Sequence, residues 1–104
     1  RIVSKPTAGI VTIDMGHKAV SAENPIDKRI RFLNLTDYEL ISQSEEHGVL
    51  KVSDWDSLKV GQVLYGVPYH ICPTVNLYEE MQVIENNTAT QTWQITARKR
   101  KISV

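Results

Sequence analysis

Hydrophobic and β-branched residues along this chain come in short runs that polar residues, glycines and prolines interrupt. Alternation of apolar and polar positions is typical of half-buried strands, whereas an amphipathic helix repeats its apolar positions at i, i+3, i+4 and i+7. No segment sustains the helical spacing over a long stretch. The sequence therefore predicts a mainly β fold, an antiparallel β-barrel or sandwich with short helical turns.

The expected strands follow from where these runs begin and end. Residues 9–15 form a nearly continuous β-branched run and predict a buried strand, and the two asparagines at 86–87 predict a hairpin tip because asparagine tolerates positive φ. In the second hairpin arm, Trp93, Ile95 and Ala97 alternate with polar residues, so we expect them to face inward. The other predicted extended segments are 1–4, 30–35, 38–42, 49–52, 62–67 and 81–85, with a brief helical turn over 74–78.

Length, charge and cysteine content limit the domain number, the partners and the compartment that we expect. The 104 residues are 41% hydrophobic and 23% charged, which fits one domain spanning 1–104. Twelve basic residues balance twelve acidic ones, so neither a nucleic acid nor a membrane is an expected partner. A single cysteine leaves no intrachain disulfide, and no apolar run has membrane-spanning length, so we expect the cytoplasm. Because the chain opens on Arg1 within strand-like composition, we expect it to begin inside a larger protein.

Candidate chemistry centres on His70-Ile71-Cys72, which sets the only cysteine two residues from a histidine. In an extended strand, side chains at i and i+2 point to the same face, so the imidazole and the thiolate can converge on one ion. Nitrogen and sulfur ligands suit zinc, and two protein ligands leave positions for water or substrate. A cysteine is also a common small buried hydrophobe, so a non-catalytic β-barrel interaction module stays an alternative.

A second candidate site lies at Glu46 and His47. A histidine beside carboxylates can be oriented for proton transfer, which makes the two residues candidate catalytic groups, and a solvated turn is the alternative. Lys18 is expected to have a surface or domain-contact role.

Five segments carry a resemblance when they are taken in order: 14–21 (DMGHKAVS), 44–48 (SEEHG), 60–63 (VGQV), 70–77 (HICPTVNL) and 93–98 (WQITAR). They resemble the C-terminal domain of the D-threonine aldolase and D-serine dehydratase family. The resemblance implies a pyridoxal-phosphate enzyme built like alanine racemase, in which an N-terminal (β/α)8 barrel carries the cofactor lysine and a C-terminal β-domain closes the active site. This chain would be the β-domain alone and inactive by itself. Its partner would be its own barrel, which would bind most of the pyridoxal phosphate, and the full-length protein would be a homodimer.

In that family, a histidine and the residue two positions later hold a divalent metal beside the cofactor, as H-x-D in most aldolases and as H-x-C in D-serine dehydratase-like members. His70 and Cys72 match the second form, and a thiolate in place of a carboxylate favours zinc over manganese. The segment 44–48 matches the family's acidic-His-Gly loop, which implies that Glu46 and His47 lie near the active site. The implied function is a lyase acting on small D-3-hydroxy amino acids, by aldol cleavage or by elimination. A racemase like alanine racemase is the alternative enzyme.

Overall fold

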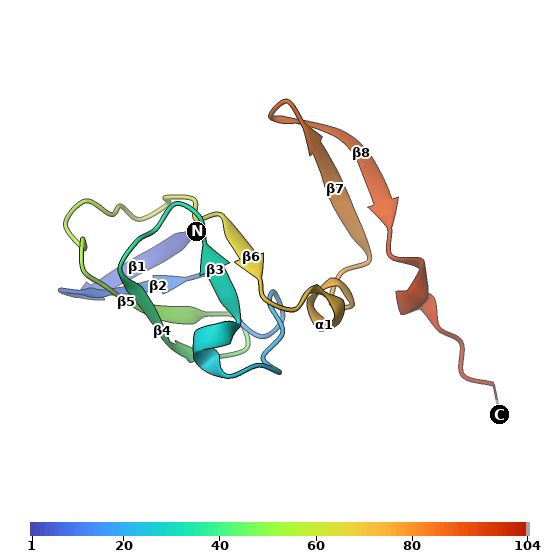
Figure 1. The fold of residues 1–104 in the computed structure, drawn as a ribbon, viewed down its shortest axis with the longest axis horizontal. Coiled ribbons are helices and arrows are strands. Elements are labelled where there is room, and N and C mark those ends of the chain that lie inside the picture. The colour runs from blue at the N-terminus through green and yellow to red at the C-terminus, as the bar shows by residue number, and fades with distance from the viewer. Residues whose placement is uncertain (104) are drawn as a thin grey trace.

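The computed structural model describes residues 1–103 and is mainly β, as predicted (Figure 1). All strand pairs are antiparallel. No helix among these residues is both long and apolar enough to cross a membrane. The strands are β1 (Ile2–Thr7), β2 (Ile10–Ile13), β3 (Ile30–Phe32), β4 (Tyr38–Gln43), β5 (Gly48–Val52), β6 (Gly66–Pro68), β7 (Glu80–Glu85) and β8 (Thr88–Gln94). The helix α1 (Ile71–Val75) and the 3-10 turns η1 (Ile26–Lys28) and η2 (Thr96–Lys99) complete the fold.

The core lies between a four-stranded sheet, ordered β1-β2-β5-β4, and the two-stranded sheet β3-β6. Val11 of β2 and Leu50 of β5 are register partners, and both are fully buried. Successive side chains of a strand point to opposite faces of the sheet, and these two point to the face that covers the core. Ile30 and Phe32 of β3 join the same apolar cluster. The arrangement resembles a sandwich, and the strands of residues 1–103 do not close into a barrel.

The segment from 62 to 75 differs from the sequence prediction. Of the expected strand 62–67, only residues 66–67 are extended, as the start of β6, which pairs with β3. His70 keeps an extended backbone as the N-cap of α1, and Cys72 is already the second helical residue. Pro73 fits this place because backbone N–H groups in the first helical turn need no intrahelical partner. The prediction that His70 and Cys72 lie on one face of a strand is therefore wrong.

The hairpin of β7 and β8 projects away from the sheets, with α1 between them (Figure 1). Asn86 and Asn87 have φ of 50° and 62°, which confirms the predicted tip. Every residue of β8 is exposed, and the chain turns into η2 after Ile95. The expected inward face through Trp93 is therefore wrong for this chain, because no other layer of residues 1–103 covers the hairpin.

Candidate functional site

The site begins where the N-terminus of α1 meets the loop 16–24. His70 directly precedes the helix, and its Nδ1 contacts Oε1 of Glu23. The two side chains are 49% and 42% exposed, so both remain open to solvent. The pair brings together residues that are 47 positions apart in the sequence. Glu23 is therefore a residue at this site that no local sequence motif indicates.

Glu23 lies in the loop 16–24, and hydrogen bonds hold this loop both before and after Glu23. On one side, the Ser21 backbone N–H donates to Oγ1 of Thr74 at 3.1 Å, and Thr74 lies buried in α1. On the other side, the Asn24 side chain donates to the Lys28 carbonyl, and Arg29 Nε donates to the Asn24 carbonyl, each at 3.0 Å. Glu23 is thus fixed relative to the helix that follows His70.

Cys72 is a free and exposed cysteine on the second residue of α1. Among residues 1–103, no three His, Cys, Asp or Glu side chains converge into a group that could hold a metal by itself. His70 and Cys72 still supply one nitrogen and one sulfur, the donor chemistry that zinc prefers. The donor types therefore fit the metal that the resemblance implies, and the remaining ligands would come from water, substrate or residues outside this chain.

The second candidate pair occupies the turn between β4 and β5. Ser44 and His47 close this turn, since the Ser44 N–H donates to the His47 carbonyl at 2.8 Å. Lys18 Nζ donates to Oε1 of Glu46 at 2.6 Å and lies 3.2 Å from a carboxylate oxygen of Glu45. The hydrogen bond from Lys18 lowers the pKa of Glu46, and the Glu46 and Glu45 carboxylates raise the pKa of Lys18. All of these side chains are exposed, so Glu46 is an ionised surface carboxylate and Lys18 has the expected surface position.

Backbone contacts explain why the segments 14–21 and 44–48 lie side by side. His17 N–H donates to the Ser44 carbonyl at 2.8 Å, and Lys18 N–H donates to the Glu45 carbonyl at 3.1 Å. A Cβ on Gly16 would lie 2.1 Å from the Glu45 carbonyl oxygen, so only glycine permits this approach. Two of the five segments of the resemblance therefore form one structural unit.

The two candidate pairs are connected only indirectly. The loop 16–24 starts against the turn that carries Glu46 and His47, and it ends at Glu23 beside His70. Within the described residues, no hydrogen bond or ion pair joins Glu46 or His47 to His70 or Cys72. The predicted roles of all four residues therefore stay predictions.

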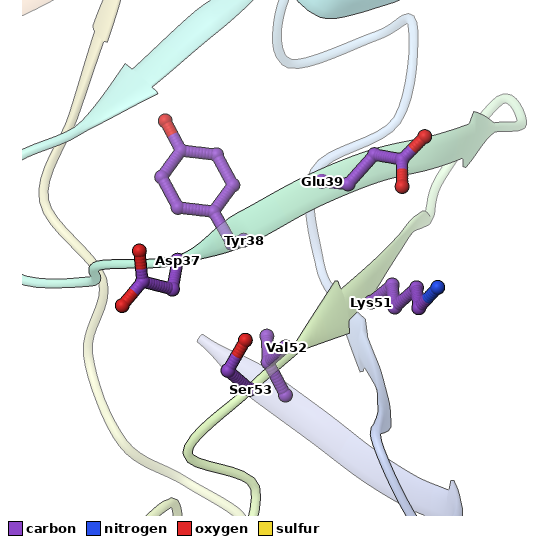
Figure 2. Close-up of a pocket in the computed structure, with 6 residues that line it drawn as sticks. All are labelled: Asp37, Tyr38, Glu39, Lys51, Val52 and Ser53. Atoms are coloured by element: carbon purple, nitrogen blue, oxygen red, sulfur yellow. The ribbon is translucent and has the colours of Figure 1, made fainter.

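Two pockets elsewhere contain fewer candidate catalytic or metal-binding side chains. A pocket of about 270 Å³ lies where β4 begins and β5 ends, and Glu39 and Lys51 in its lining are register partners of opposite charge. Figure 2 shows these lining side chains. The lining of this pocket contains no histidine or cysteine. A mostly apolar groove of about 430 Å³ lies between α1 and β7 and includes Ile71, Tyr78 and Met81. Because the lining of this groove is mostly apolar, the groove suits contact with another apolar surface better than catalysis.

Comparison with known proteins places this fold and site in a family. The family described as "Putative serine dehydratase domain" matches residues 1–84. The chain belongs to this family and is a C-terminal domain of the D-threonine aldolase and D-serine dehydratase-like proteins.

Individual relatives agree with this assignment. Over 98 residues the chain is 34% identical to the D-threonine aldolase of Arthrobacter sp and 31% identical to the 3-hydroxy-D-aspartate aldolase of Paracoccus denitrificans (strain Pd 1222). These alignments cover 93% of this chain, but only 25% and 24% of the two aldolases. The crystal structure of D-threonine aldolase from Filomicrobium marinum matches with a TM-score of 0.75 at 27% identity, over 93% of this chain and 26% of that one. The chain thus spans about a quarter of the length of these relatives.

Proposed function

We propose that this chain is the metal-binding C-terminal domain, residues 1–104, of a pyridoxal-phosphate-dependent lyase that acts on D-3-hydroxy amino acids. The observation that carries the proposal is the His70-x-Cys72 motif, which lies at an exposed helix start within the part of the chain that the family matches. Two relatives support the substrate class, because D-threonine and 3-hydroxy-D-aspartate both carry a hydroxyl at the third carbon. Elimination from D-serine is the other reaction that the proposal includes.

In this proposal, His70 and Cys72 bind zinc. Cys72 must lose its thiol proton to bind, so metal binding releases a proton and metal affinity rises with pH. Two ligands from one short segment are too few for high affinity, so the chain alone binds weakly. When bound, the zinc would supply a Lewis acid for the substrate hydroxyl, and pyridoxal phosphate would supply the electron sink. The chain's thiolate ligand also suits a reducing compartment, the cytoplasm.

Glu46 and His47 are the candidate proton-transfer groups. Because Lys18 holds Glu46 in its ionised form, this carboxylate is suited to accept a hydrogen bond rather than to donate a proton. His47 is exposed on the same turn, and imidazole is the side chain that most readily exchanges protons near neutral pH. His47 is therefore our first choice for a group that moves a proton, with Glu46 as a binding group.

The proposal also assigns a partner to the exposed apolar side chains beyond α1. Met81, Ile84 and Trp93 of the hairpin are 38%, 61% and 56% exposed, and Met81 also lines the apolar groove between α1 and β7. We propose that these residues contact the protein's own N-terminal (β/α)8 barrel, which would hold the cofactor lysine, in a homodimeric enzyme.

The test is a lyase assay on the protein extended to the length of its aldolase relatives. D-threonine cleavage would release glycine and acetaldehyde, whereas D-serine elimination would release pyruvate and ammonia, so the products identify the reaction. We expect Cys72→Ala to abolish activity while the pyridoxal absorbance remains, and Cys72→Asp to shift the metal preference towards manganese. Full lyase activity in a metal-stripped Cys72→Ala enzyme would refute the proposed role of the metal.

A further inference from the structure

The contact between Glu23 and His70 has a role that neither the sequence nor the relatives assign. We propose that Glu23 is a positioning residue that fixes the ring orientation and the tautomer of His70, so that Nε2 is presented to a metal. This inference rests on the proposed function, because it assumes that His70 is a ligand.

The geometry supports this role through the atom that Glu23 uses. Glu23 contacts Nδ1 of His70, and a neutral imidazole carries its proton on only one of its two nitrogens. A carboxylate at Nδ1 accepts a hydrogen bond and holds the proton there, which leaves the lone pair on Nε2. Histidines that bind metals usually donate their other ring N–H to a carboxylate or a carbonyl in this way. The contact therefore prepares Nε2 for a cation.

The anchoring of the loop makes this contact a fixed one. Ser21 is bonded to Thr74 within α1, the same helix that His70 precedes, so the loop and the imidazole are held by one element. Asn24 is bonded to the 28–29 backbone and side chain on the other side of Glu23. With Ser21 and Asn24 held on either side, the backbone at Glu23 has little freedom to move away from the imidazole.

Stability and positioning make different predictions for this pair. Both side chains are about half exposed, and exposed ion pairs contribute little to the free energy of unfolding. Loss of Glu23 should therefore leave the melting temperature nearly unchanged, while a positioning role requires that metal affinity falls. The two effects can be measured on the same variant.

The experiment titrates the 104-residue chain with Co²⁺ and Zn²⁺ and follows the thiolate-to-cobalt absorption. We expect Glu23→Ala to weaken binding by about 10–100-fold, the usual cost of losing such an orienting partner. Glu23→Gln should recover most of the affinity, because its amide oxygen still accepts from the Nδ1 proton. Asp56→Ala, which removes an exposed acid from the loop after β5, is the matched control for loss of one negative charge and should bind as the parent does.

A second readout needs no metal. In ¹⁵N NMR spectra of the metal-free chain, His70 should be the Nδ1–H tautomer in the parent and in Glu23→Gln, and should lose that preference in Glu23→Ala. Unchanged affinity or an unchanged tautomer in Glu23→Ala would overturn the inference. Equal losses in Glu23→Gln and Glu23→Ala would also overturn it, because the carboxylate would then act as a ligand or through its charge. Absence of metal binding by the parent chain would instead overturn the proposed function, and the tautomer measurement would still decide whether Glu23 positions His70.

Discussion

The sheets of residues 2–68 and the hairpin of β7 and β8 share one sequence pattern and differ in burial. Both contain alternation of apolar and polar side chains, as in Ile30-Arg31-Phe32 of β3 and Met81-Gln82-Val83 of β7, and both form antiparallel strands. Yet every buried hydrophobic residue that the structure describes lies between Ile2 and Leu58, whereas Met81, Ile84 and Trp93 of the hairpin remain exposed. Alternation therefore predicts that a strand forms, but it does not identify what covers the apolar face of that strand. In the sheets the cover comes from this chain, and for the hairpin we propose that it comes from another domain.

The largest effect that this comparison predicts is on stability. Leu50 is fully buried on β5, between β2 and β4, so Leu50→Ala should lower the free energy of unfolding by about 2–5 kcal/mol. Trp93→Ala removes a larger side chain from an exposed position and should cost less than about 1 kcal/mol, the scale of one cross-strand pair. Urea denaturation of both variants measures the difference. Equal losses would mean that the hairpin is packed in solution and that the contrast with the sheets is wrong.

The next effect concerns the close approach of the loop 16–24 to the turn at 44–47. Gly16→Ala would place Cβ against the Glu45 backbone, so we expect the turn to be displaced and the free energy of unfolding to fall by about 1–3 kcal/mol or more. Gly61 is a useful control because its φ is +88° and a Cβ added there would have no atom within 4 Å. Gly61→Asn should cost about 1 kcal/mol or less, because a side chain is strained at this φ but asparagine tolerates positive φ better than most residues. A neutral Gly16→Ala in the same denaturation assay would contradict the observed approach.

Sequence reasoning located most of the fold and only part of the site. The buried strand at β2 and the positive-φ hairpin tip were predictable because short-range pattern and turn chemistry determine them. The helical turn expected over 74–78 begins earlier, as α1 at Ile71–Val75, and this start was not predictable because Pro73 ends a strand pattern as readily as it fits a first helical turn.

The contacts across the site show a second limit of the sequence. His70 and Cys72 stand out because histidine and cysteine are chemically distinctive. Glu23 is one of many surface acids, and nothing in the sequence distinguishes it from the others. Only the folded loop brings its carboxylate to the imidazole of His70. Thr74 was expected to begin a helical turn, whereas its buried hydroxyl holds the loop instead.

A smaller effect is expected at this anchor. Thr74→Val keeps the side-chain shape but removes the acceptor of the Ser21 N–H, which should cost about 1–2 kcal/mol. Hydrogen exchange at the Ser21 amide should become faster in this variant. Unchanged exchange would show that the loop 16–24 is held by its other contacts, and would contradict its anchoring to α1 through Thr74.

The smallest effect is electrostatic and affects the turn between β4 and β5. The pKa of Glu46 is lowered and that of Lys18 is raised, so their interaction is complete between the ordinary pKa values of the two groups, roughly pH 4 to 10. It is lost as the pH falls through the lowered pKa of Glu46 or rises through the raised pKa of Lys18. Lys18→Met should return the pKa of Glu46 towards its ordinary value in an NMR titration, with little change in stability because the groups are exposed. An unshifted Glu46 titration would contradict the pairing.

We propose that His70 and Cys72 together bind a metal, although the helix that begins between them removes the shared strand face. X-ray absorption at the zinc edge of the zinc-loaded chain can identify these ligands, because zinc–sulfur and zinc–nitrogen bonds have distinct lengths. If His70 and Cys72 bind zinc, the spectrum should show one sulfur at about 2.3 Å together with nitrogen and oxygen ligands at about 2.0–2.1 Å, and Cys72→Ala should lose the sulfur signal. A zinc spectrum without sulfur in the parent chain, or an identical spectrum in Cys72→Ala, would contradict the proposal.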